Sequence, residues 1–337
     1  MKTNFKTQNK FAHSSLIKTA LFSVSVLALT GGAANALVIN PFFDSSVTSS
    51  EQQVIEGAIS SYENMFSNPE TVSIEFMTSS AGGGTSQASD YVAPYSTYTN
   101  WLGINAINSG DSYAVEAYNN LKYGNTAQQV LFTSADGRAL GCTNCVGGVA
   151  AQGSISSSTM VDGIVTVGSS YYGNGAQVVY HEIDEVLGIG GQGSVLQASM
   201  AIPPPLINNE TTIGAMDLYR YSAPQTPSLT NSTSAYSYFS LNGGTTQIVA
   251  FNQSGVGDYG DWASGQGCYI QTYETCSNPT PLSVTSPEGM ALQAVGYDAI
   301  VPAQNVPEPG SFYSLLAGAA LLGIVRVKSK TRYNQKA

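Results

Sequence analysis

The residues best suited to chemistry lie in one short segment, residues 177–188. Its sequence, QVVYHEIDEVLG, places His181, Glu182 and Glu185 among apolar residues whose spacing predicts a helix. On a helix, His181 and Glu185 are one turn apart and share a face, with Glu182 beside them. An imidazole and a carboxylate at this spacing can bind zinc together, and a neighbouring carboxylate can take a proton from water. The alternative is an ordinary surface pair between His181 and Glu185.

Histidine is scarce in this chain, which contains only His13 and His181. His13 lies in an N-terminal segment that we expect to be removed. Any further side-chain ligand beside His181 must therefore be a carboxylate or a tyrosine, unless water completes the site. We expect Asp217 to be the third ligand, because it follows a Pro-rich loop that could fold back over the helix. The alternative is that Asp217 caps a turn or pairs with Arg220.

The segment that begins at His181 resembles the metal helix of the zincins, and within them that of the metzincins. These secreted metalloproteases carry the pattern H-E-x-x-H-x-x-G-x-x-H. His181 matches the first ligand, Glu182 the general base and Gly188 the glycine at which the chain turns. Glu185 replaces the second histidine, and Gly191 stands at the third-ligand position, where it cannot ligate through a side chain. The resemblance implies an α+β, zincin-like (metzincin-type) catalytic domain with one catalytic zinc.

Other blocks of the chain resemble a group of exported bacterial proteins of inferred metalloprotease function. Those proteins pair H-E-I-x-E-x-x-G with D-L-[FY]-R-Y-S, and some carry a PEP-CTERM tail. The matching blocks here are residues 217–224, 238–246, 257–262 and 294–298. Asp258 and Asp261, in the sequence GDYGDW, could instead hold calcium or cap loops.

Both ends of the chain carry the features of sorting signals. Residues 1–36 combine a basic stretch, a short apolar run and a small-x-small cleavage site, which predicts a secretory signal peptide. Residues 306–332 combine Pro-Glu-Pro, an apolar run and a basic tail, and they resemble the PEP-CTERM signal of Gram-negative bacteria that make exopolysaccharides. We expect a transmembrane helix at about 312–327 with its basic flank in the cytoplasm. The resemblance implies export to the envelope or beyond, transient anchoring in the inner membrane, and processing by an exosortase.

Charge is distributed very unevenly along the chain. Residues 37–306 contain 21 acidic residues and three basic ones, Lys122, Arg138 and Arg220. So few bases cannot neutralise a run of phosphates, which excludes nucleic acid as a partner. Residues 37–305 are long enough for one domain with a substantial core.

Four cysteines fall in the expected exported part of the chain. Cys142 and Cys145 are close in sequence, as are Cys268 and Cys276. In an exported protein this spacing predicts two local disulfides, and a four-cysteine zinc site is the alternative.

Hydrophobic periodicity predicts the elements that must position the candidate residues. We expect a helix at 50–67, capped by Ser49 or Ser50 and ended by Pro69, and then a strand at 71–77. A Gly/Ser loop should occupy 79–89, and the metal helix should span about 175–187. The loop- and β-rich C-terminal half should end in a short helix at 287–295.

Three functions are compatible with these features. The first is an exported zinc-dependent endopeptidase that acts on proteins or peptides, with Glu182 as general base and with His181, Glu185 and Asp217 as zinc ligands. The second is a catalytically inactive zincin-fold protein of the cell surface or biofilm matrix, sorted by the exosortase, because the second and third histidines are missing. The third is a carbohydrate- or calcium-binding domain, suggested by the acidic, Tyr-rich C-terminal half.

Overall fold

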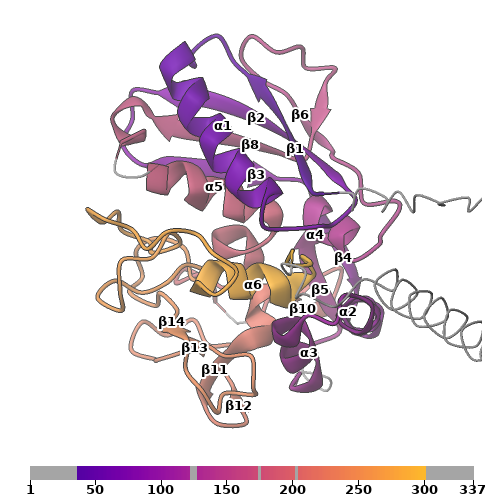
Figure 1. The fold of residues 1–337 in the computed structure, drawn as a ribbon. Coiled ribbons are helices and arrows are strands. Elements are labelled where there is room, and N and C mark those ends of the chain that lie inside the picture. The colour runs from indigo at the N-terminus through magenta and orange to yellow at the C-terminus, as the bar shows by residue number, and fades with distance from the viewer. Residues whose placement is uncertain (1–35, 122–126, 174–175, 202–203, 301–337) are drawn as a thin grey trace, which may run out of the picture. The chain divides into compact units, whose positions relative to one another are not determined.

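The computed structural model describes residues 36–121, 127–173, 176–201 and 204–300 (Figure 1). The predicted sorting signal at 306–332 lies outside these residues, and so does the predicted signal peptide at 1–36 apart from its last residue. Within the described part of the chain, no helix has the length and apolar character needed to cross a membrane. The predicted transmembrane helix at about 312–327 lies outside that part.

A four-stranded sheet, in the order β1-β2-β8-β3, forms the N-terminal half of the fold (Figure 1). Its strands are β1 (Val38–Phe43), β2 (Thr71–Ser79), β8 (Gly163–Gly168) and β3 (Gly84–Ala88). The first three strands are parallel, whereas β3 runs antiparallel to β8 and forms one edge. The sheet is therefore mixed, which agrees with the α+β class expected from the sequence.

Strand β3 corrects one expectation from the sequence, which predicted a Gly/Ser loop throughout 79–89. Gly84 pairs with Val167, and Ser86 pairs with Val165 in the middle of β8. The small residues are needed at this place, because a Cβ atom on Gly84 would collide with Glu182 of the metal helix. Composition hid the strand, since close packing against a helix selects glycine and serine here over typical strand formers.

Helices α1 (Ser49–Glu63) and α5 (Gln177–Leu187) contact each other and pack on strands of this sheet. The predicted helix at 50–67 is α1, but its cap is Thr48 rather than Ser49 or Ser50. Thr48 and Glu51 form a reciprocal capping box, which satisfies backbone donors at the helix start. Helix α5 corresponds to the expected metal helix and lies against β3 and β8.

The remaining elements form further sheets and short helices. A second sheet has the order β4-β5-β10-β9, a third has the order β12-β11-β13-β14, and β6 pairs with β7. The helices are α2 (Tyr95–Ser109), α3 (Ser112–Asn119), α4 (Ser134–Ala139) and α6 (Pro287–Val295). The strands are β4 (Asp90–Pro94), β5 (Gln129–Thr133), β6 (Val149–Ala150), β7 (Met160–Val161), β9 (Leu206–Ile207), β10 (Glu210–Gly214), β11 (Arg220–Ala223), β12 (Thr226–Pro227), β13 (Tyr238–Phe239) and β14 (Val249–Ala250). The described part is thus a mixed α+β fold with several sheets and six α-helices.

Disulfides close two local loops in this fold. Cys142 is bonded to Cys145, and Cys268 is bonded to Cys276. Both pairs are the ones expected from sequence proximity. Because all four sulfurs are engaged, they are not available as zinc ligands.

Candidate metal centre

Helix α5 is the element that places the candidate metal ligands. Its apolar residues Val179, Ile183 and Val186 are fully buried and hold the helix on the core. The helix ends at Gly188, which has φ 105°, a left-handed conformation that favours glycine. A Cβ atom at Gly188 would lie 3.0 Å from the Cβ of Asp136, so close packing also requires glycine at this turn.

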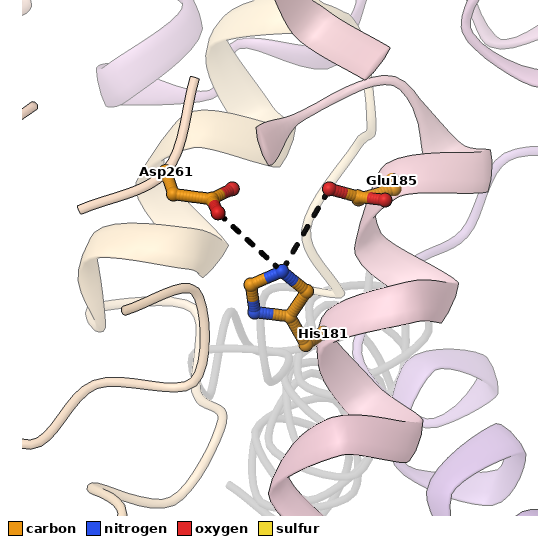
Figure 2. A group of neighbouring side chains, drawn as sticks. All are labelled: His181, Glu185 and Asp261. Carbon is orange, nitrogen blue, oxygen red and sulfur yellow. Dashed lines mark ion pairs between the residues drawn. The ribbon is translucent and has the colours of Figure 1, made fainter. Parts of the chain in front are cut away.

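His181, Glu185 and Asp261 converge beside this helix (Figure 2). The Nε2 atom of His181 lies 3.7 Å from Oε1 of Glu185 and 3.7 Å from Oδ2 of Asp261. One ligand atom from each residue lies within 4.8 Å of the other two. The separations are too long for hydrogen bonds, but they suit three atoms arranged around a common ion.

The hydrogen bond of the His181 ring decides what Nε2 can do. Its Nδ1 atom lies 3.2 Å from the carbonyl oxygen of Ile270. A carbonyl oxygen only accepts, so Nδ1 carries a proton, and Nε2 of the neutral ring has a free lone pair. That lone pair faces the carboxylates of Glu185 and Asp261, an arrangement that requires a proton or a cation between the groups. The donor set therefore fits a metal ion.

Both carboxylates also accept hydrogen bonds from the protein. Glu185 Oε2 accepts a hydrogen bond from the Ser86 hydroxyl at 2.5 Å, and Glu185 Oε1 accepts one from the Gly191 N–H at 2.9 Å. Asp261 Oδ1 accepts one from the Gln271 side chain at 3.1 Å. Gly191, at the position of the third metzincin ligand, thus supports Glu185 through its backbone. A Cβ atom there would lie 2.5 Å from Glu185 Oε1.

Burial and neighbouring charges shift the pKa values of these groups in the metal-free protein. Burial lowers the pKa of His181, but the carboxylates of Asp261, Glu182 and Glu185 together raise it to about 10. Burial raises the pKa of Asp261 to about 7, with His181 opposing this rise. Burial also raises the pKa of Glu185 and, with the help of the Glu185 charge, that of Glu182. Such a concentration of negative charge is well matched to a divalent cation.

Glu182 lies next to this three-residue cluster but is not part of it. Its side chain is 4 % exposed and contacts Gly84 of β3. Its Oε2 atom is buried and has no hydrogen-bond partner. A carboxylate oxygen left unpaired beside a metal-ligand set is placed to accept and release a proton.

These residues line a cleft of about 450 Å³. It is bordered by Thr85 and Ser86 of β3, by α5, and by a C-terminal segment that includes Asp258 and Tyr273. The lining residues contain four carboxylates and no lysine or arginine. The candidate centre therefore opens into a cleft whose lining consists mainly of acidic and uncharged polar residues.

Asp217 lies outside this group of ligands. It is fully buried in a short 3₁₀ turn, where it accepts hydrogen bonds from the N–H groups of Val195 and Gly214 and from the Ser194 hydroxyl. Its Oδ1 atom also pairs with Nε of Arg220 at 3.2 Å. This is the turn-and-Arg220 role that the sequence offered as its alternative.

Asp261, and not Asp217, lies in the cluster with His181 and Glu185. Asp261 was noted in GDYGDW only as a calcium ligand or loop cap. The sequence feature that could have pointed to Asp261 is the neighbouring Trp262. Its side chain is fully buried and brings its segment into the core.

We compared the chain with protein-family models, with curated proteins and with solved structures, and found no match to any of them. The functional interpretation therefore depends on the residues and their geometry.

Proposed function

We propose that this chain is an exported zinc-dependent endopeptidase. The observation that carries the proposal is the convergence of His181, Glu185 and Asp261 in the lining of a cleft, beside Glu182, whose Oε2 atom has no hydrogen-bond partner. His181, Glu185 and Asp261 would hold the zinc. Zinc binds both imidazole nitrogen and carboxylate oxygen, and three protein ligands leave one position open to substrate.

The chain's own residues have distinct tasks in this mechanism. When bound, zinc supplies a Lewis acid that polarises the peptide carbonyl and makes water more acidic. Glu182 takes the proton of the attacking water on its buried carboxylate and passes it to the leaving amine. The Ile270 carbonyl keeps the proton of His181 on Nδ1, and Ser86 and Gly191 fix the orientation of Glu185. Two carboxylate ligands lower the charge of the site, so we expect slower turnover than from a site rich in histidine.

Substrate is expected to bind along β3. This strand is an edge of its sheet, and three of its residues, Gly84, Thr85 and Ser86, line the cleft. An extended peptide can add to such an edge through backbone hydrogen bonds, which are independent of sequence. The acidic lining favours neutral or basic side chains over acidic ones.

The finer fold and the location belong to the same proposal. The mixed sheet, α1, α5 and the turn at Gly188 support a zincin-like domain of metzincin type. The departure is that a ligand from the C-terminal half, Asp261, replaces the histidine that normally follows the turn. The end segments 1–36 and 306–332 support export, anchoring in the inner membrane through the C-terminal helix, and exosortase processing.

Metal analysis and one conservative substitution test the proposal. We expect about one zinc per purified chain, lost in His181→Ala, Glu185→Ala and Asp261→Ala. Glu182→Gln should keep the zinc and lose about 10²–10⁴-fold in peptide hydrolysis. Zinc in the wild type without hydrolysis of a broad peptide library would favour the inactive matrix protein. No zinc, or zinc that survives all three alanine substitutions, would overturn the proposed centre.

A further inference from the structure

Glu288 is a buried carboxylate that the proposed mechanism does not use. It is the second residue of α6, whose N-cap is Ser286 and whose first residue is Pro287. Its side chain is fully buried, although α6 lies far along the chain from the metal helix. Placement in the first turn of a helix favours an anion, because backbone N–H groups point toward it. Burial of a carboxylate costs free energy, which indicates that Glu288 has a role beyond packing.

The Oε1 atom of Glu288 joins two separate segments of the chain. It accepts a hydrogen bond from the Trp262 indole at 3.0 Å and one from the Gln271 backbone N–H at 3.1 Å. The backbone N–H of Trp262 also donates to the Gln271 carbonyl at 2.9 Å, which joins the same two residues directly. Glu288 therefore clamps residues 262 and 271 together from the interior.

Each of these two residues is the chain neighbour of a group that contacts His181. Asp261 precedes Trp262, and its Oδ2 atom lies 3.7 Å from Nε2 of His181. Ile270 precedes Gln271, and its carbonyl lies 3.2 Å from Nδ1 of His181. The Gln271 side chain adds a hydrogen bond to Asp261 at 3.1 Å. Both nitrogens of the imidazole are thus faced by groups whose chain neighbours Glu288 holds, Trp262 through its indole and Gln271 through its backbone N–H.

We propose that Glu288 is a positioning residue of the metal centre, and that its Oε1 atom fixes the segments that bring the Asp261 carboxylate and the Ile270 carbonyl to His181. The inference rests on the proposed function for its metal. The hydrogen bonds of Glu288 Oε1 go to Trp262 and Gln271, so it acts on the three ligands through these two residues. The clamp also explains why a distant helix is needed to complete a site built on α5.

Zinc affinity measured by competition with a chelating dye tests the proposal. Glu288→Leu removes the acceptor and should raise the Kd for Zn²⁺ by about 10- to 100-fold, the range typical of changes behind metal ligands. Glu288→Gln keeps an acceptor oxygen and should stay within about threefold of wild type. The matched control is Gln293→Leu on the same helix, since Gln293 is also buried and its side-chain amide donates to the carbonyls of Val284 and Gly289.

Unchanged affinity in Glu288→Leu, or an equal loss in Gln293→Leu, would overturn the proposal. If Glu288→Leu does not fold, Trp262→Phe provides the test, because it removes one donor to Glu288 and keeps an aromatic ring. It should weaken Zn²⁺ binding several-fold. Wild-type affinity in this variant would also overturn the proposal.

A zinc-free measurement separates this inference from the proposed function. NMR of the His181 ring in the metal-free chain reports whether its Nδ1–H is held by the Ile270 carbonyl. We expect a hydrogen-bonded, slowly exchanging Nδ1–H in wild type and Glu288→Gln, and a rapidly exchanging one in Glu288→Leu. A wild type that binds no zinc would refute the enzyme, whereas an equally protected Nδ1–H in Glu288→Leu would refute the clamp.

Discussion

Asp217 and Asp261 are both buried carboxylates of the C-terminal half, but their surroundings differ. Asp217 accepts hydrogen bonds from two backbone N–H groups and one hydroxyl, and it pairs with Arg220. Asp261 has one hydrogen-bonded oxygen, and its other oxygen faces the His181 ring at 3.7 Å. Asp261 lines the cleft, whereas Asp217 is fully buried.

The difference separates structural from functional acids. A carboxylate whose oxygens are occupied by donors and a guanidinium has no capacity left for a ligand, and its burial is compensated. A carboxylate that faces an imidazole lone pair without a hydrogen bond is compensated only when a cation arrives. The following predictions test whether this distinction holds, from the largest expected effect to the smallest.

Alanine at Asp261 should abolish zinc binding. The expected rise in Kd exceeds the roughly 100-fold upper range of changes behind metal ligands, because a direct ligand is lost. Asp217→Asn is the matched control and should retain about one zinc per chain. Metal content by mass spectrometry distinguishes the two. Zinc retained in Asp261→Ala but lost in a folded Asp217→Asn would reverse the comparison and restore Asp217 as the third ligand.

Alanine at Asp217 should instead destabilise the fold. It leaves the buried Arg220 guanidinium without this carboxylate, which typically costs about 3–5 kcal/mol of unfolding free energy. Urea unfolding with a chelator present measures the loss. Asp261→Ala should change the zinc-free stability much less, since it removes a carboxylate that the metal-free protein compensates poorly. Similar losses in both variants would mean that both acids are structural.

Helix α5 could be predicted from sequence because its information is local. The spacing of His181 and Glu185, the apolar residues between them and the glycine that follows are all contained in one short segment. Asp261 could not be predicted in the same way. It reaches His181 only because Trp262 pairs with Phe251 and Thr272 and is held by Glu288, contacts that depend on distant parts of the chain.

The α+β class followed from periodicity, and the two disulfides followed from short spacing. Strand β3 was missed for the opposite reason. Its sequence, GTSQA, has little strand character, and its pairing is imposed by β8 and by the demand for small residues beside Glu182. A strand of this kind can be identified only when the elements that pack against it are known.

Stability of the metal-free protein should depend on pH through Asp261. Its folded pKa of about 7 lies above the ordinary value of 3.8. Its contribution to stability is therefore fully present below about pH 4 and is lost as the pH rises through 7. We expect unfolding free energy to fall by at most about 1.4 kcal/mol per pH unit, up to about 4 kcal/mol.

The control for this pH dependence is Asp261→Asn, which should make the profile less steep when stability is measured with a chelator; Glu70 and Asp90, whose pKa values burial raises to about 8 and about 6, still contribute. The contribution of His181 is lost mainly above this window, because its pKa is raised from 6.5 to about 10. An unchanged profile in Asp261→Asn would show that another group carries the pH dependence.

Alanine at Gly84 should separate the general base from the metal. Its Cβ would collide with Glu182 Oε1 and with Val178, so the Glu182 carboxylate must move. A displacement of this size typically lowers kcat about 100-fold, while zinc content should stay at wild type. Gly82→Ala is the control, because its Cβ would meet only Tyr171 at an ordinary 3.5 Å. Equal hydrolysis by both variants would argue against Glu182 as the base.

Alanine at Ser86 should have the smallest effect. The Ser86 hydroxyl donates to Glu185 Oε2 at 2.5 Å, so Glu185 is intermediate between Asp217 and Asp261 in how far its oxygens are occupied. Its loss should raise the zinc Kd by about tenfold, since Gly191 still holds Oε1. Thr85→Ala, next along β3 with its side chain on the other face, should leave the Kd unchanged. Zinc binding as tight as wild type in Ser86→Ala would show that the number of hydrogen bonds accepted by a carboxylate does not distinguish ligands from structural acids. The position of an oxygen facing His181 would then be the distinguishing feature.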